Sequence, residues 1–288
     1  MRHPRPRFML RWQLLASILI LCLAAATPSV ARPLDEVKAS GYLRIAVYDR
    51  FKPFSWVENG RPRGIDVDIA KRLAQGLGVR PQFFMVRAGD DIGGDLRNGV
   101  TRGTLTRDPP GDVMMHVPFD RTLEEQVELL RLFAPYYTDG LMMVVAPSDA
   151  KAAEDFSLFE RKKVAVDVGS LADFVVVSAR DHTLIKNVVH FRGIENAFQA
   201  FEQGKVAAFY GVISEIQPLL RKSKRKYRIV HPPAHVPDTW ITSLAVRINA
   251  SDLGYALSDQ LDRMRTSGEL KSIFARYGVE YRAPVLPE

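Results

Sequence analysis

Cysteine is almost absent from this sequence of 288 residues, which contains only Cys22. A single cysteine excludes an intramolecular disulfide, and it excludes zinc or iron–sulfur sites built on several cysteines. Low-complexity segments and internal repeats are absent as well, and the composition excludes intrinsic disorder and collagen-like chains. The composition, 47% hydrophobic and 25% charged, is sufficient for one large or two modest domains with sizeable cores.

Long hydrophobic runs are also missing, because the apolar stretch near the N-terminus covers only residues 14–26. A membrane span needs about 20 apolar residues, so this stretch is too short. It follows a basic segment with four arginines and no acid, and it ends at Ser29-Val30-Ala31. This pattern is typical of a secretory signal peptide. We predict a signal peptide over residues 1–31, with a cut near Ala26 as the alternative, and hence a periplasmic protein.

An excess of charge of one sign is largely confined to that segment. The full chain has 40 basic and 33 acidic residues and a net charge of +7. Cleavage after Ala31 removes four arginines, so 40 − 4 = 36 bases face 33 acids and the net charge becomes +3. Nucleic-acid binding therefore loses its main support, and no nucleic-acid partner is expected.

The rest of the chain alternates between strand and helix patterns. Strands are expected at residues 42–47, 81–86, 112–115, 141–145, 163–166, 206–210 and 241–246, and helices at 67–74, 194–203, 214–221 and 252–276. This alternation is typical of an α/β protein with mostly parallel sheets. Two stretches, residues 146–149 and the proline-rich 231–237, are the expected crossings between two lobes. We predict lobe 1 over residues 32–145 and 241–288 and lobe 2 over 146–240, with a ligand cleft between them.

Ordered motifs then reveal a family resemblance. The run Gly64–Ile69, followed by Leu73-Ala74 and Leu77, resembles the signature of the bacterial extracellular solute-binding proteins of family 3. Residues 133–137, 164–170 and 268–278 are similar to further motifs of the same family. The resemblance implies a type II periplasmic-binding-protein fold, in which two α/β lobes close around a small solute. The signature acids Asp66 and Asp68 are expected to be structural, at the N-terminal turn of a helix.

The residues that would select an amino acid depart from the family pattern. Members that bind α-amino acids carry an Arg for the ligand carboxylate about twelve residues after an Asp that opens a lobe 1 strand. Counted from Asp112, that position holds Glu124, with Arg121 nearby as a substitute. The family's Asp for the ligand ammonium is replaced by Gly211 or Val212. We therefore expect a small polar solute that is not a standard α-amino acid.

The resemblance also implies which residues face the ligand. Phe51 matches an aromatic residue that stacks on the ligand, and Ser170 opens a lobe 2 helix whose N-terminal amides suit an anion. For His116, a structural histidine with satisfied hydrogen bonds is an equal alternative. The full set of candidates is Tyr48, Phe51, His116, Val117, Phe119, Arg121, Ser170 and Tyr210. No cofactor or metal is expected, since Asp90, Asp91 and Asp95 match no calcium loop.

Three functions stay open on sequence alone. The first is a monomeric receptor that delivers its solute to the membrane permease of an ABC-type transporter. The second follows from residues 94–98 and 111–118, which resemble periplasmic proteins associated with quinoprotein (PQQ-dependent) alcohol or methanol dehydrogenases, and it is an accessory role beside such an enzyme. The third is an enzyme of the same fold, such as cyclohexadienyl dehydratase. No catalytic motif is present, so we expect the protein not to be an enzyme.

Overall fold

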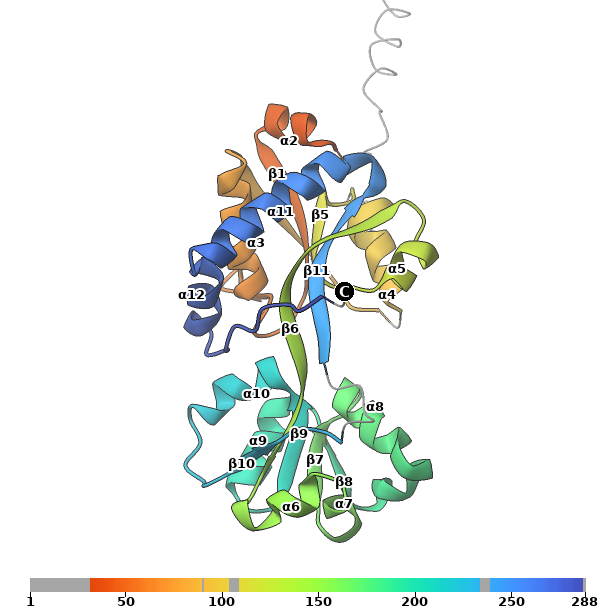
Figure 1. The fold of residues 1–288 in the computed structure, drawn as a ribbon, viewed down its shortest axis with the longest axis vertical. Helices are drawn as coiled ribbons and strands as arrows, with labels where there is room; N and C mark the ends of the chain where they lie inside the picture. The colour runs from red at the N-terminus through yellow and green to blue at the C-terminus, as the bar shows by residue number, and fades with distance from the viewer. Residues whose placement is uncertain (1–31, 90, 104–108, 234–238, 287–288) are drawn as a thin grey trace, which may run out of the picture. The chain divides into compact units, whose positions relative to one another are not determined.

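A computed structural model describes residues 32–89, 91–103, 109–233 and 239–286 (Figure 1). The predicted signal peptide lies outside these residues, as do Asp90 and His235. Residues from Ala31 onward form one compact unit. Across the described ranges, no helix has both the length and the apolar character that crossing a membrane requires.

The strands of lobe 1 make up one half of a nine-stranded sheet in the described part of the chain. β1 (Tyr42–Tyr48) lies between β4 (Arg80–Val86) and β5 (Val113–Pro118) and is parallel to both. β11 (Thr239–Arg247) lies antiparallel between β5 and β6 (Leu130–Val145). The segment that follows lobe 2 in sequence therefore supplies an inner strand of lobe 1.

The strands of lobe 2 continue from the far end of β6. Its last residues pair antiparallel with β9 (Ala208–Val212) and β10 (Arg228–Val230). β7 (Val164–Asp167) is parallel to both β8 (Val188–Phe191) and β9. The predicted parallel pairing thus holds for the inner strands of each lobe, while β6 and β11 are antiparallel connections. β6 is also longer than the expected strand at residues 141–145, because it serves both halves of the sheet.

The helices are mostly where the apolar spacing predicts them. They are α2 (Leu34–Ser40), α3 (Ile65–Gly76), α4 (Ile92–Leu96), α5 (Arg121–Gln126), α6 (Ala150–Ala153), α7 (Leu158–Arg161), α8 (Leu171–Ser178), α9 (Ile194–Glu202), α10 (Ile213–Leu220), α11 (Ser251–Thr266) and α12 (Glu269–Arg276). A short hairpin of β2 (Trp56–Glu58) and β3 (Arg61–Arg63) precedes α3. The expected single helix at 252–276 is in fact two helices, because Gly268 has a φ of 77° and ends the helical path there.

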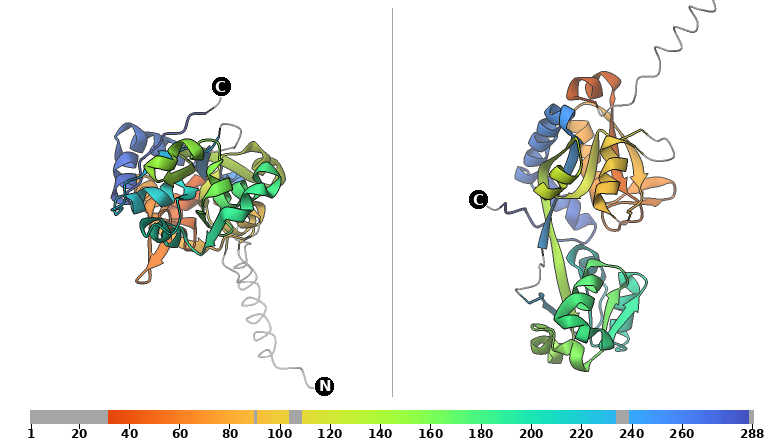
Figure 2. Two further views of the ribbon diagram at one scale, coloured as in Figure 1. Left: turned by 90° about the horizontal axis from the view of Figure 1, so that it is seen from below. Right: turned by 90° about the vertical axis from the view of Figure 1, so that its right-hand side faces the viewer.

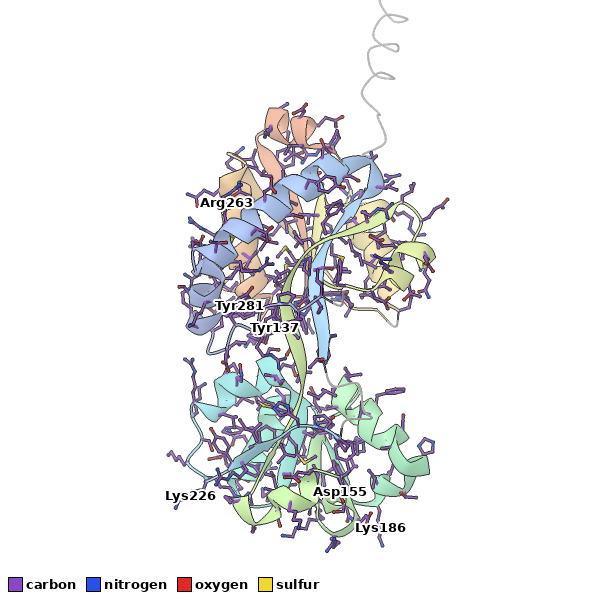
Figure 3. All side chains as sticks on the ribbon, viewed as in Figure 1. Tyr137, Asp155, Lys186, Lys226, Arg263 and Tyr281 are labelled. Atoms are coloured by element: carbon purple, nitrogen blue, oxygen red, sulfur yellow. The ribbon has the colours of Figure 1, made fainter. Side chains whose placement is uncertain are left out.

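Two layers of helices enclose the lobe 1 half of the sheet. α3, α11 and α12 pack with β1 on one face, and α4 and α5 contribute to a second cluster on the other (Figure 2). Aromatic rings fix the C-terminal segment to this lobe: the Phe274 ring lies 4.5 Å from that of Tyr137 and 5.2 Å from that of Tyr281 (Figure 3). Lobe 2 has its own buried clusters on β7 and β9. The lobe boundaries after residues 145 and 240 remain a prediction.

Candidate functional site

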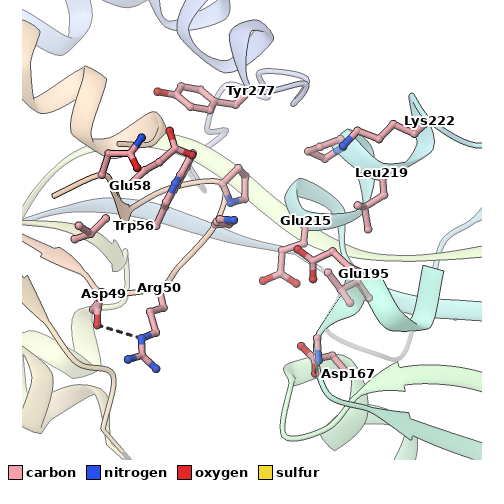
Figure 4. Close-up of a pocket in the computed structure, with 17 residues that line it drawn as sticks. Asp49, Arg50, Trp56, Glu58, Asp167, Glu195, Glu215, Leu219, Lys222 and Tyr277 are labelled. Atoms are coloured by element: carbon pink, nitrogen blue, oxygen red, sulfur yellow. Dashed lines mark hydrogen bonds and ion pairs between the residues drawn. The ribbon is translucent and has the colours of Figure 1, made fainter. Parts of the chain in front are cut away.

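A cavity of about 1130 Å³ lies between residues of the two lobes (Figure 4). From lobe 1 it is lined by the loop that follows β1, by the β2 strand and by Tyr277 of the C-terminal segment. From lobe 2 it is lined by residues that follow three neighbouring strands. The complete lining is Asp49, Arg50, Lys52, Pro53, Trp56, Val57, Glu58, Asn59, Asp167, Gly193, Ile194, Glu195, Glu215, Pro218, Leu219, Lys222 and Tyr277.

Three carboxylates form the lobe 2 wall of this cavity, and the topology explains why they meet. Asp167 is the last residue of β7, Glu195 is in the first turn of α9 after β8, and Glu215 is in the first turn of α10 after β9. Because β7, β8 and β9 are parallel, their carboxyl ends lie at one edge of the sheet. This edge is where α/β proteins hold their ligands. We call Asp167, Glu195 and Glu215 the acid wall.

The acid wall is electrostatically strained. Burial raises the pKa of Glu215, and the negative charges of Asp139, Asp167 and Glu195 act in the same direction. Together they bring this pKa to about 8. Burial also raises the pKa of Asp167, although the Gly193 N–H donates a hydrogen bond of 2.8 Å to its Oδ1. Near neutral pH a proton therefore occupies this group of carboxyls. A cation in the cavity would compete with that proton.

Asp139, on β6, adds negative charge behind the wall. It accepts hydrogen bonds from Ser214 Oγ at 2.5 Å and from the Gly140 N–H at 2.8 Å. Burial nevertheless raises its pKa, against these hydrogen bonds. Asp139 is 1% exposed and does not line the cavity, so it acts on a solute only through its field.

The lobe 1 wall carries charges of both signs. Asp49 and Arg50 directly follow β1, and their side chains form an ion pair at 3.6 Å. The ammonium of Lys52 lies 5.6 Å from the centre of the Trp56 ring. The two bases of this wall, Arg50 and Lys52, are matched by two acids, Asp49 and Glu58. The net formal charge of the lobe 1 wall is therefore close to zero. Lobe 2 contributes three acids and Lys222, and the excess negative charge therefore belongs to the lobe 2 side.

Three of the candidates predicted from the sequence lie together inside lobe 1, and none of them lines the interlobe cavity. The Tyr48 hydroxyl donates to Asp95 Oδ2 at 3.2 Å, and its ring meets that of Phe51 edge to face. The Phe51 ring lies 4.7 Å from the imidazole of His116. His116 Nδ1 lies 3.1 Å from Asp66 Oδ2, so both side chains are engaged inside the lobe. This contact supports the structural alternative for His116.

The other predicted candidates lie away from the interlobe cavity. Val117 is fully buried, and Tyr210 is buried in the lobe 2 core with its ring 5.8 Å from that of Phe156. Phe119 and Arg121 line a separate cavity of about 470 Å³ on lobe 1. Ser170 caps α8, where its hydroxyl accepts from the Asp173 N–H at 3.2 Å.

The residues at the two positions that the resemblance assigns to the amino-acid clamp have structural roles in this protein. Glu124 Oε1 accepts from the Leu132 N–H at 2.6 Å, and this side chain lines the cavity of Arg121 instead of the interlobe one. At Gly211 an added Cβ would lie 2.8 Å from Ile194 Cδ1, so an Asp there would displace a packed side chain. Glu215, in the first turn of α10 after β9, brings a carboxylate to the cavity from a different position.

Sequence reasoning overlooked most of the acid wall. Asp167, Glu195 and Glu215 are absent from the set of ligand-binding residues predicted from the sequence. A usable signal was present, because an acid closes or closely follows each of the parallel lobe 2 strands. The expected helix at 194–203 already placed Glu195 in a first turn, but the strand before it, β8, was not predicted.

Comparison with known proteins supports the fold. Residues 43–99 match the sequence profile of the bacterial extracellular solute-binding proteins, family 3. A cyclohexadienyl dehydratase from Pseudomonas aeruginosa is 42% identical over 69 residues, which is 24% of this chain and only 25% of that protein. A probable amino-acid ABC transporter periplasmic-binding protein from Sinorhizobium fredii is 24% identical over 278 residues, 91% of this chain and 85% of that protein.

The solved structure of an ancestral cationic amino-acid solute-binding protein superposes with a TM-score of 0.66. It is 24% identical and covers 85% of this chain and 99% of its own. At this identity the likeness speaks for the fold. The predicted resemblance is confirmed over residues 43–99, which match the profile of the extracellular solute-binding proteins of family 3, and the chain has the fold of a type II periplasmic binding protein.

Proposed function

We propose that this protein is a periplasmic solute receptor that holds a small cationic solute in the interlobe cavity and delivers it to the permease of an ABC-type transporter. The observation that carries the proposal is the acid wall, and above all Glu215. This carboxyl lines the cavity, and burial and neighbouring acids raise its pKa to about 8. The name of the Sinorhizobium fredii relative, a transporter binding protein, supports the transport role.

The physical argument is electrostatic. An ammonium about 4 Å from a carboxylate gains about 4 kcal/mol at the effective dielectric constant of a protein surface. Asp167 and Glu195 add to this attraction, and the raised pKa of Glu215 reflects its burial and the negative charges of its neighbours.

The cavity also indicates how the solute is enclosed. Its volume of about 1130 Å³ exceeds the 300–1,000 Å³ or so that usually encloses a drug-sized ligand. A small solute held by the acid wall therefore reaches the lobe 1 wall only if the lobes approach one another. The energy for this approach comes from contacts that the solute makes in the closed form alone. The closed form is what a permease would distinguish.

A binding screen tests the proposal. Butane-1,4-diamine, butylguanidinium, L-arginine, neutral L-amino acids and dicarboxylates would be compared by thermal shift and by isothermal titration calorimetry. Cations should raise the melting temperature, and dicarboxylates should not. Glu195→Gln and Glu215→Gln should each weaken cation binding at least tenfold. Glu154→Gln, which changes an exposed acid on the same lobe, is the matched control and should bind like wild type.

The residues at the clamp positions also bear on whether neutral α-amino acids bind. Since Glu124 and Gly211 occupy the clamp positions, we propose that neutral standard α-amino acids do not bind. A ligand at 100 times its Kd stabilises the folded state by about 2.7 kcal/mol, which a thermal-shift assay detects readily. A clear shift with alanine or glutamine would remove this part of the proposal and leave the cation site standing.

The accessory and enzymatic functions remain predictions with less support. An accessory protein of a quinoprotein dehydrogenase should capture that enzyme from a periplasmic extract, whereas a receptor should be compacted by its solute in small-angle scattering. The partial similarity to cyclohexadienyl dehydratase covers a quarter of that enzyme. We propose binding without catalysis, and a turnover assay on dehydratase substrates with the Glu215→Gln variant beside wild type would test it.

A further inference from the structure

We propose that the solute also carries an anionic group, and that Arg50 and Lys52 on the lobe 1 wall bind it. The solute class would then be a zwitterion with separated charges, such as an ω-amino or ω-guanidino carboxylate. This inference rests on the proposed cation site and deepens it. Arg50 and Lys52 would then bind the carboxylate in place of the family's arginine, whose position holds Glu124 in this chain.

The position of Arg50 supports this role. It lies two residues after Tyr48, the end of β1, and β1 is parallel to β4 and β5. Arg50 is therefore at the carboxyl edge of the lobe 1 sheet, as the acid wall is at the carboxyl edge of the lobe 2 strands. Both edges contribute to the same cavity. A solute between them meets Arg50 and Lys52, beside Asp49 and Glu58, on one side and the acid wall on the other.

The side chain of Arg50 is available for a ligand. It is 83% exposed, and its partner, Asp49, lies at 3.6 Å, which is beyond hydrogen-bonding distance. The guanidinium has five N–H donors and binds a carboxylate through two parallel hydrogen bonds. Figure 4 shows Arg50 extending from the lobe 1 loop on the side of the cavity that faces Asp167. Lys52 adds a second positive charge on the same loop.

The backbone at Arg50 is unusual as well. Its φ of 57° is in the left-handed region, which non-glycine residues seldom occupy. Asn59, also in the lining, has a φ of 50°. Left-handed backbone at a non-glycine residue costs about 1–2 kcal/mol and is concentrated at functional sites. The loop after β1 thus keeps a costly conformation that directs Arg50 to the cavity.

The separation of the two walls determines the solute class. In a neutral α-amino acid the ammonium and the carboxylate are bonded to one carbon, so both cannot reach opposite walls at once. In an ω-amino carboxylate the charges are at opposite ends of a flexible chain. L-Arginine carries a distal guanidinium and a carboxylate and satisfies the same rule, but its α-ammonium would lie beside Arg50. The proposal therefore expects 5-aminopentanoate to bind more tightly than L-arginine.

Calorimetry with matched ligands tests the proposal. Wild type should bind 5-aminopentanoate at least tenfold more tightly than pentylamine, which has the same chain and ammonium without the carboxylate. The double variant Arg50→Gln with Lys52→Gln should lose this difference and bind pentylamine at least as tightly as wild type does. Arg263→Gln, which changes an exposed base on the outer helix α11, should leave both affinities unchanged (Figure 3).

The outcomes separate the two proposals. If pentylamine and 5-aminopentanoate bind wild type equally well, the anionic subsite is refuted and the cation site stands. A tenfold preference that survives in the double variant also refutes the role of Arg50 and Lys52. If neither compound binds and Glu215→Gln changes nothing for any cation, the cation site fails, and the inference fails with it.

Discussion

Raising the pH should strengthen the binding of a cation in the interlobe cavity, with Glu215 as the responsible residue. In the free protein, burial and the carboxylates of Asp139, Asp167 and Glu195 raise the pKa of Glu215 to about 8. A bound cation favours the charged carboxylate, so binding expels the proton that Glu215 carries below that pKa. Affinity and proton release are thus linked through one group.

The size of the effect follows from the ionised fraction of Glu215. With a pKa of about 8, this carboxyl is ionised in about 3% of molecules near pH 6.5 and in about 90% near pH 9. The Kd of a cation that requires the ionised form should therefore fall about 30-fold over this interval. Butylguanidinium is a suitable probe, because a guanidinium stays protonated throughout the range.

Isothermal titration calorimetry in two buffers of different ionisation enthalpy measures both the Kd and the number of protons released. Wild type should release close to one proton near pH 7. Glu215→Gln should release none and should bind with nearly constant affinity, while Glu154→Gln should keep the full dependence. Identical pH profiles for wild type and Glu215→Gln, or an affinity that falls as the pH rises, would refute the reasoning.

Three further predictions address stability and the clamp positions. Folding raises the pKa of Glu215 from 4.5 to about 8, so the stability linked to its neutral form is fully present below pH 4.5 and is lost as the pH rises to about 8. The melting temperature of the free protein should therefore fall over that pH range, and it should fall less in Glu215→Gln. A chain that ends before Trp240 lacks β11, α11 and α12 and should lose the cooperative transition of lobe 1, whereas one that ends at Pro284 should melt like wild type; equal melting curves for the two truncations would contradict the strand order. Arg121→Ala and Glu124→Ala should change cation affinity by less than about twofold, since both residues line the separate lobe 1 cavity, and calorimetry that finds a tenfold loss would restore the family clamp.

Most of the fold could be predicted because local patterns decide it. The apolar spacing of Val67, Ile69, Ala70, Leu73 and Ala74 predicts a helix, and all five side chains are buried in α3. The short continuous apolar runs of β1, β7 and β11 are likewise local patterns, and they predict buried strands. The boundary inside residues 252–276 was missed because apolar periodicity continues across Gly268, and only its left-handed backbone separates the two helices.

From the sequence, site residues could be predicted only where they match a position of the family motif or follow one strand that is itself predicted. The assignment of Glu124 and Gly211 to the clamp positions stays a prediction, to which the structure adds the hydrogen bond of Glu124 and the side chains packed around Gly211. The acid wall depends on which strands are neighbours, and this is a property of the sheet. Asp167 and Glu195 are 28 residues apart in sequence and Glu195 and Glu215 are 20 apart, and only the parallel pairing of β7, β8 and β9 unites them.

The place of β11 between β5 and β6 also sets the order in which the chain can fold as it emerges during synthesis. The pairing of Val246 with Arg131 cannot form until all of lobe 2 has been made. Lobe 2 needs only the end of β6 and the strands up to β10, so it can be completed first. Until the last part of the chain arrives, β5 presents an unpaired edge, and such edges are prone to aggregation. A vectorial process, whether translation or export, therefore leaves lobe 1 as the late and vulnerable half of this protein.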